Sequence, residues 1–285
     1  AVRNMGHSIG IAECTFDGNL AKTDGGAVYN SSGGITVATS GFTNNSAGKN
    51  GGAIHNLKNL VTIQDCAFAD NYARTDGGAV YNSKGLVTIE ISEFARNSAG
   101  RNGGAVRNTS AAIAVERSEF VGNFAKTDGG AVYNASAAVS LASSTFSGNS
   151  AGRNGGAVRN LKHSVAIGDC AFDENHARTD GGAVYNSSGM ITVASSGFAR
   201  NSAGQNGGAI RSASAAVTIE GSAFTDNAAQ GQGGAVYNAK GTTSTSWSTF
   251  TNNAAVKNGG AVFGTNRAVD IRGCAFRDNL TGGDG

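Results

Sequence analysis

Acidic residues recur in this chain at a spacing that could build a charged site. The octapeptide TDGGAVYN occurs four times, with its carboxylate 52 residues further along each time, at Asp24, Asp76, Asp128 and Asp180. Halfway between these copies the motif reads KNGGAIHN or RNGGAVRN, so Asn replaces Asp. Such a carboxylate could bind Ca²⁺, but the motif lacks the cluster of oxygen ligands that this ion prefers. We therefore expect a salt-bridged surface, with no metal site and no cofactor.

Further carboxylates stand close together in the sequence and could serve as a general acid and base. They are Asp65, Asp70, Glu90, Glu93, Glu116, Glu119, Asp173 and Glu174. A catalytic pair needs a suitable separation and two distinct environments, and nothing in the sequence distinguishes one pair. The histidines His7, His55, His163 and His176 show no zinc-ligand spacing. We predict that the chain is not an enzyme, with a polysaccharide lyase or hydrolase as the enzymatic alternative.

Two motifs repeat every 26 residues along the whole chain. The triplet GGA occurs ten times, from Gly25 to Gly259, and Phe-x-x-Asn occurs eleven times, from Phe16 to Phe276. Short alternating runs such as Val61-Thr62-Ile63 precede each Phe and indicate a half-buried strand. The Gly-Gly pair argues against a helix. We predict three strands per coil and an all-β fold.

This pattern predicts one parallel β-helix domain over residues 1–285, made of eleven coils of 26 residues and uncapped at both ends. Because one coil cannot close a core, neighbouring coils must stack, and eleven coils would form a rod roughly 53 Å long. Residues 26 apart then become neighbours. The expected interior ladders are an aromatic stack, Phe16, Phe42, Phe68 and Phe94, and an amide ladder, Asn19, Asn45, Asn71 and Asn97. The Ala five residues after each Phe suggests a tight turn.

The third strand of each coil carries alternating rings and cations. We expect a surface column formed by Tyr29, His55, Tyr81, Arg107, Tyr133 and Arg159, with each cation between two rings. The Asp/Asn alternation would also keep stacked carboxylates two coils apart, at about 9.6 Å, since directly paired like charges destabilise a sheet. Recent duplication of a two-coil unit would produce the same pattern, and both interpretations stay open.

The composition of the chain restricts the classes of partner that it could bind. The formal charge of +2, without a run of Lys or Arg, gives no basis for nucleic-acid binding, and no apolar stretch is long enough to span a membrane. The four cysteines, Cys14, Cys66, Cys170 and Cys274, share one position in the repeat. The closest two lie two coils apart, beyond disulfide reach within one rod. We expect buried free thiols.

The paired signatures FxxN and GGA[IV], as in Phe42-Thr43-Asn44-Asn45 and Gly51-Gly52-Ala53-Ile54, resemble the repeats of the chlamydial polymorphic outer-membrane proteins. The resemblance extends over essentially all 285 residues. It implies a right-handed parallel β-helix in an extracellular or cell-surface passenger that acts in adhesion or surface assembly. This chain shows neither the barrel nor the long irregular insertions of that family.

The two ends of the sequence are in register with each other. Gly285 corresponds to the first Gly of a further GGA triplet, and Ala1 corresponds to its Ala. We expect identical subunits to stack head to tail into a fibre or surface layer. The interface would contain Ala1, Val2, Arg3, Cys14, Phe263, Cys274, Asp284 and Gly285. The alternative is an adhesin segment that binds a host or neighbouring cell surface, or its glycans.

Overall fold

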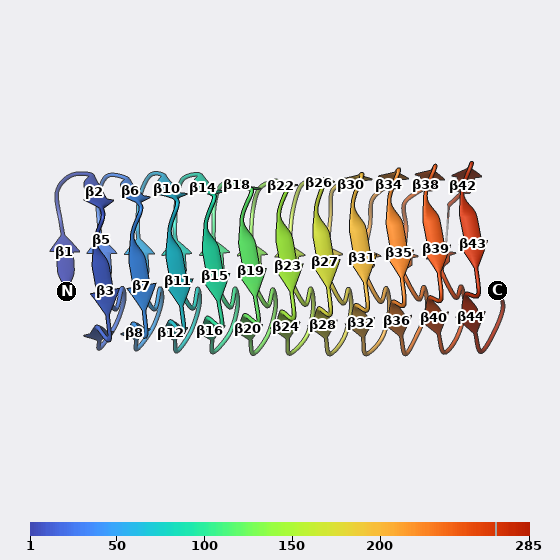
Figure 1. The fold of residues 1–285 in the computed structure, drawn as a ribbon, viewed down its shortest axis with the longest axis horizontal. Coiled ribbons are helices and arrows are strands. Elements are labelled where there is room, and N and C mark those ends of the chain that lie inside the picture. The colour runs from blue at the N-terminus through green and yellow to red at the C-terminus, as the bar shows by residue number, and fades with distance from the viewer. Residues whose placement is uncertain (266) are drawn as a thin grey trace.

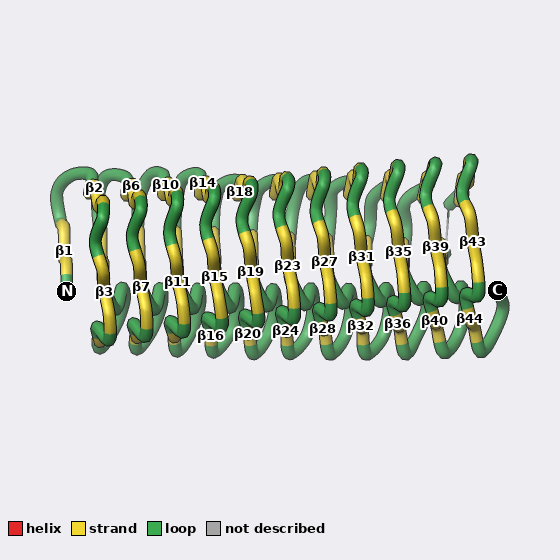
Figure 2. Tube along the Cα trace, viewed as in Figure 1, coloured by secondary structure: helices red, strands yellow, loops and turns green. Residues whose placement is uncertain are grey.

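The computed structural model describes residues 1–265 and 267–285, which form one continuous stack of coils with its ends at opposite tips of the rod (Figure 1). These residues contain strands and turns and no helix (Figure 2). Every coil contributes one strand to each of four parallel sheets of eleven strands. Paired residues are 26 apart, as in Phe68 opposite Phe94. The predicted β-helix of eleven 26-residue coils is therefore confirmed.

We name the four sheets A to D. Sheet A contains β1 (Val2–Asn4), β5 (Val28–Asn30), β9 (Ile54–Asn56), β13 (Val80–Asn82), β17 (Val106–Asn108), β21 (Val132–Asn134), β25 (Val158–Asn160), β29 (Val184–Asn186), β33 (Ile210–Ser212), β37 (Val236–Asn238) and β41 (Val262–Gly264). Sheet B contains β2 (Ile9–Ala12), β6 (Ile35–Ala38), β10 (Val61–Gln64), β14 (Val87–Glu90), β18 (Ile113–Glu116), β22 (Val139–Ala142), β26 (Val165–Gly168), β30 (Ile191–Ala194), β34 (Val217–Glu220), β38 (Thr243–Ser246) and β42 (Val269–Arg272).

The other two sheets complete each coil. Sheet C contains β3 (Thr15–Asp17), β7 (Gly41–Thr43), β11 (Ala67–Ala69), β15 (Glu93–Ala95), β19 (Glu119–Val121), β23 (Thr145–Ser147), β27 (Ala171–Asp173), β31 (Gly197–Ala199), β35 (Ala223–Thr225), β39 (Thr249–Thr251) and β43 (Ala275–Arg277). Sheet D contains β4 (Leu20–Ala21), β8 (Ser46–Ala47), β12 (Tyr72–Ala73), β16 (Ser98–Ala99), β20 (Phe124–Ala125), β24 (Ser150–Ala151), β28 (His176–Ala177), β32 (Ser202–Ala203), β36 (Ala228–Ala229), β40 (Ala254–Ala255) and β44 (Leu280–Thr281).

Sheet D corrects the prediction of three strands per coil. The small residue five positions after each Phe does not form a turn; it is the second residue of a two-residue strand and points into the core, as Ala73 does. Two residues are too few to show the alternation that identifies a strand in a sequence. The strand forms because the neighbouring coils supply its hydrogen-bond partners.

The interior of the rod is an aromatic stack along sheet C. Consecutive Phe rings lie 4.7–4.9 Å apart between centroids and 2–7° from parallel. From Phe42 to Phe250 these side chains are at most 1% exposed. The aliphatic residues of sheets A and B, such as Val80 and Ile89, complete the core. Burial of this continuous apolar column is the main term that favours stacking.

The Gly-Gly pair of each coil is required by how closely the coils approach. The first Gly adopts a left-handed conformation, as at Gly77 with φ +66°. The second packs against the next coil: a Cβ added to Gly78 would lie 2.0 Å from the carbonyl oxygen of Gly104. No side chain fits there, which explains why the pair recurs without exception in the repeat.

Candidate functional surface

The predicted ring and cation column lies in the middle of the sheet A strands, one residue per coil. Arg107 lies between two tyrosines, with its guanidinium carbon 5.4 Å from the ring centroid of Tyr81 and 5.2 Å from that of Tyr133. Arg211 lies 5.0 Å from the tyrosine ring on each side. His55 occupies the same position between Tyr29 and Tyr81. Arg107, Arg211 and His55 thus each lie between two aromatic rings of neighbouring coils.

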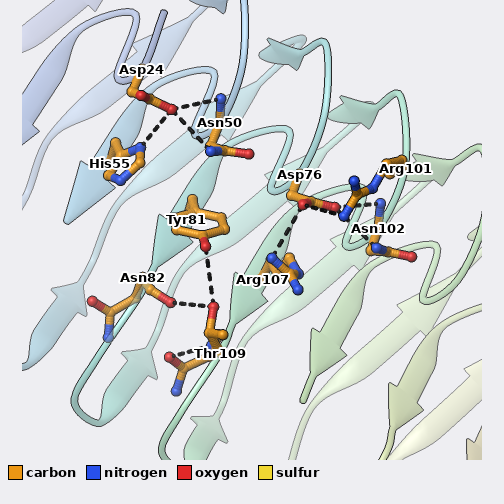
Figure 3. A network of polar contacts seen from close by, with 11 residues as sticks. Asp24, Asn50, His55, Asp76, Tyr81, Asn82, Arg101, Asn102, Arg107 and Thr109 are labelled. Carbon is orange, nitrogen blue, oxygen red and sulfur yellow. Dashed lines mark hydrogen bonds and ion pairs between the residues drawn. The ribbon is translucent and has the colours of Figure 1, made fainter. Parts of the chain in front are cut away.

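The Asp of each TDGG motif binds the coil that follows it, as Figure 3 shows for Asp24 and Asp76. Asp76 Oδ1 accepts hydrogen bonds from the backbone N–H and the side-chain Nδ2 of Asn102, at 3.1 and 3.0 Å. The same two bonds join Asp24 to Asn50. They also recur in the Asp128–Asn154 and Asp180–Asn206 pairs. The Asp/Asn alternation is therefore a donor–acceptor match between coils, which the sequence interpretation missed.

The second carboxylate oxygen of the Asp pairs with a cation of the following coil. Arg107 Nη1 lies 3.1 Å and Arg101 Nη2 3.3 Å from Asp76 Oδ2. Asp76 and Arg107 are shielded from solvent, with side chains 4% and 13% exposed, whereas Arg101 is 59% exposed. The shielded pair therefore carries more of the electrostatic stabilisation than the exposed one.

In the first coil a histidine stands in place of the arginine, and it approaches the carboxylate oxygen that also accepts the two Asn50 bonds. His55 Nδ1 lies 3.1 Å from Asp24 Oδ1 (Figure 3). Burial alone would raise the pKa of Asp24, but the hydrogen bond and charge of His55, together with the N–H donors of Asn50, outweigh burial and lower it. The carboxylate form is thus favoured where it accepts these bonds.

Arg159 departs from this pattern. Its Nη1 donates to the carbonyl of Asn160, its Nη2 donates to Ser187 Oγ at 2.7 Å, and its guanidinium carbon lies 4.0 Å from the Tyr185 ring centroid. Asp128 pairs with the exposed Arg153 instead, at 2.7 Å. Burial lowers the pKa of Arg159, since a charge that leaves water is penalised.

The side chains of the ring and cation column are less exposed to solvent than a surface column predicts. His55, Tyr133, Arg159 and Tyr237 are all at most 9% exposed, and burial raises the pKa of Tyr133 although nearby arginines oppose this. Tyr29, Tyr81 and Arg107 are half-buried. Each side chain is covered mainly by the rings and cations of the coils on either side. The sequence pattern could not show this, because alternation in one strand does not reveal how tightly columns pack.

An amide ladder runs through the interior of the rod. Asn45 Nδ2 donates to Asn71 Oδ1 at 3.0 Å and Asn71 Nδ2 donates to Asn97 Oδ1 at 2.9 Å, while Asn19 joins at the first coil with a bond of 2.8 Å to Asn45. Each Nδ2 from Asn45 onward also donates to a Phe carbonyl of the preceding coil. This network satisfies the buried corner between sheets C and D.

Two further ladders were not predicted. An Asn ends most sheet A strands and is buried in the inner coils, and Asn30 Nδ2 donates to Asn56 Oδ1 at 3.0 Å. At the corner between sheets B and C, Ser40 Oγ accepts the backbone N–H of Cys14 at 3.0 Å and donates to the Ala38 carbonyl. The Asn–Asn bonds join Asn4, Asn30, Asn56 and Asn82, and beyond Asn82 the amides donate to turn carbonyls, as Asn134 does to Ala137. The 26-residue spacing of these Asn and Ser residues was the signal in the sequence.

The exposure of the four cysteine thiols depends on the coil in which each lies. Cys66 and Cys170 are buried and Cys274 is half-buried, whereas Cys14 at the first coil is exposed; all four are free. Burial raises the pKa of Cys66 and of Cys170. Among residues 1–265 and 267–285, no three His, Cys, Asp or Glu side chains gather as a metal site would require.

The residues predicted to join subunits lie on the outermost coils. Val2 is 42% exposed, and Ala1, Arg3, Asp284 and Gly285 are exposed as well. At the other edge of the stack, Val269, Ile271 and Phe276 are 41–47% exposed and line a hollow of about 470 Å³. Equivalent side chains are covered in the inner coils. Phe263 is half-buried against Tyr237, with ring centroids 5.7 Å apart.

The described part of the chain holds no helix with the length and apolar character needed to cross a membrane.

Seven segments of the chain match the Chlamydia polymorphic membrane protein repeat. They are residues 13–31, 42–57, 117–135, 143–160, 169–187, 221–239 and 248–265. No curated protein and no solved structure gives a significant match. Each matched segment spans all or part of the stretch from the Phe strand through Gly-Gly to the next sheet A strand. Seven segments of the chain are therefore similar to the Chlamydia polymorphic membrane protein repeat, and they stack as parts of a parallel β-solenoid.

Proposed function

We propose that the chain is a rigid, non-enzymatic structural segment at the cell surface or outside the cell, and that it assembles head to tail with identical subunits by continuing its own coil stacking. The surface location is supported by the match to a membrane-protein repeat family. The assembly is supported by the repeat itself. Each sheet contains ten coil-to-coil pairings in one register, so both edges of a coil are complementary to each other.

The outermost coils supply the surfaces for this contact. Val269, Ile271 and Phe276 present apolar side chains at one edge, and Val2 does so at the other. In continued register, Phe276 would stack on Phe16 as the interior rings do on one another. Phe263 would then lie beside Arg3, and Cys274 beside Cys14. An interface that places unlike edges together is open-ended and forms fibres.

The test images residues 1–285 by electron microscopy and follows association by sedimentation. Stacked rods should give filaments with an axial repeat near 53 Å, from eleven coils about 4.8 Å apart. The double substitution Val269→Lys and Ile271→Lys should abolish filaments, because it buries two charges at the contact. Val256→Lys is the control, since Val256 is 56% exposed. Dispersed rods at every salt and redox condition would refute assembly.

The match to polymorphic membrane protein repeats favours a second candidate, an adhesin segment. In this case the rod holds a binding surface away from the cell that carries it. Binding of labelled rods to cultured cells, with filament-defective variants included, would separate the two functions. An adhesin would bind whether or not it forms filaments.

A further inference from the structure

The outer face of sheet D carries exposed rings on alternate strands. Tyr72 on β12 is 45% exposed, Phe124 on β20 is 44% exposed, and His176 on β28 is exposed as well. The strands between them place Ser98 and Ser150 directly opposite these rings in the sheet register. The short strands lie side by side along the lower edge of the rod in Figure 1. From the third to the seventh coil, this wall therefore displays a planar side chain on every second coil.

A cation accompanies each ring. Arg74, Lys126 and Arg178 stand two residues after the three rings and are exposed, while the residue between ring and cation is a buried Ala. The cation lies in the bend one residue beyond the two-residue strand, and ring and cation are both exposed on either side of the inward-pointing Ala. None of the three cations makes an ion pair within the described parts of the chain, whereas Arg101 and Arg153 one coil away are paired with Asp.

Nearby carboxylates do not neutralise these cations. Asp70 is bound by both Nε and Nη2 of Arg96, at 2.9 and 2.8 Å. Asp173 and Glu174 both bind Arg200. The acids that border this wall thus have their own partners, and the three cations remain available to an anion from solution.

The spacing of the ring and cation units is set by the coils. Coils lie about 4.8 Å apart, as the interior Phe stack shows, so one ring and one cation recur about every 9.6 Å. The pattern stops beyond the seventh coil, where Ala228 with Gln230 and Ala254 with Val256 take these positions. We call Tyr72, Arg74, Phe124, Lys126, His176 and Arg178 the ring–cation row.

We propose that the ring–cation row binds an extended, anionic polysaccharide with a disaccharide repeat, lying along the axis of the rod. Aromatic rings pack against the apolar faces of sugar rings, and an unpaired Arg or Lys binds a carboxylate. An extended β-linked disaccharide is about as long as two coils, so each would meet one ring and one cation. Ser98 and Ser150 lie between the units, where they can bond sugar hydroxyls. The proposal holds whether or not the rods assemble.

Nucleic acid fits this row poorly. A nucleic-acid strand carries a phosphate every ~3.4 Å along a duplex, about three times the density of the cations. Lys22 in the first coil takes the same position after the exposed Leu20, and it too lies two coils from the next cation, so it does not raise the charge density. One cation for every two coils instead suits a polymer with one carboxylate in each disaccharide.

The test measures binding of size-defined hyaluronan oligosaccharides to residues 1–285 by calorimetry. Hyaluronan is the probe because it is β-linked and carries one carboxylate per disaccharide. Affinity should rise from one to three disaccharides and then level off, since the row has three units. Added salt should weaken binding. Sedimentation under the same conditions reports rod assembly separately, so failure of one proposal is distinguishable from failure of the other.

Two triple variants test the two halves of the row. Tyr72, Phe124 and His176 are all changed to Ser, the residue that occupies this position on β16 and β24, so the fold should survive. Arg74, Lys126 and Arg178 are all changed to Gln in the second. Each variant should weaken binding by at least about tenfold. The control changes Lys58, Lys84 and Lys162 to Gln, which removes the same charge from exposed turns beyond sheet A.

Three results would overturn the proposal. The first is hyaluronan binding that both row variants leave intact, or no binding at all by the unmodified chain. The second is an equal loss in the lysine control, which would show only a general charge effect. The third is equally tight binding of single-stranded DNA or polyglutamate of matched charge, which would show that sugar rings are not recognised.

Discussion

Substitution of Asn97 by Ala should destabilise the middle of the rod strongly. The Asn97 side chain is fully buried and takes part in four hydrogen bonds. Its Nδ2 donates to the Phe68 carbonyl and to Asn123 Oδ1, at 2.9 and 3.0 Å. Its Oδ1 accepts the backbone N–H and the Nδ2 of Asn71, at 3.1 and 2.9 Å. The substitution removes all four.

The expected cost follows from these bonds. Each lost bond contributes a net value of about 1 kcal/mol, or each buried group left without a partner costs about 1–3 kcal/mol in desolvation. The free energy of unfolding should therefore fall by roughly 3–5 kcal/mol. Asn19 is the matched control, because it occupies the same ladder on the outermost coil and is only half-buried. Its replacement by Ala should cost about 1 kcal/mol, since water can reach the groups that lose a partner.

Native-state hydrogen exchange is the sharpest assay. The Asn71 amide donates to the Asn97 side chain, whereas the adjacent Tyr72 amide donates to the Asn45 backbone. In the Asn97→Ala variant the Asn71 amide should lose protection by about a hundredfold, with a smaller effect at Tyr72. Urea unfolding followed in parallel should show a lower midpoint. Unchanged protection at Asn71, or equal costs for the two variants, would refute the ladder as a source of stability.

Three other predictions test the contacts between coils. Gly104→Ala should prevent folding or lower the unfolding midpoint sharply, because its Cβ would lie 1.9 Å from a carbonyl oxygen of the next coil, while Gly197→Ala, with open space around it, should leave circular dichroism and melting unchanged. Asp76→Asn keeps the bonds to the next coil but removes the shielded ion pair and should cost about 1–3 kcal/mol in urea unfolding. The exposed pair broken by Asp70→Asn should cost less than about 1 kcal/mol, and the reverse order would contradict the burial argument. Burial raises the pKa of Cys66, so at pH 8 this thiol should be alkylated only on unfolding, as mass spectrometry of the peptides would show.

The repeat alone determined which residues become neighbours. A period of 26 without insertions places equivalent residues opposite each other once the coils stack in register, and the structure pairs them in this way throughout. The Phe stack and the first Asn ladder were predictable for this reason. The additional ladders through Asn30 and Ser40 follow from the same rule, although their significance depends on burial that the sequence does not state.

Features that depend on the path of the backbone within one coil are visible only in the tertiary structure. Sheet D consists of two-residue strands, which have no recognisable period and form only against their neighbours. The contact from Asp76 to Arg107 joins residues 31 apart, so it depends on how the Gly-Gly turn carries one coil past the next. Shielding of the ring and cation column likewise results from packing between coils. The sequence thus determines which residues stack on one another. The burial of each side chain, the pairing of charges and the exposure of the ring–cation row depend on the folded rod.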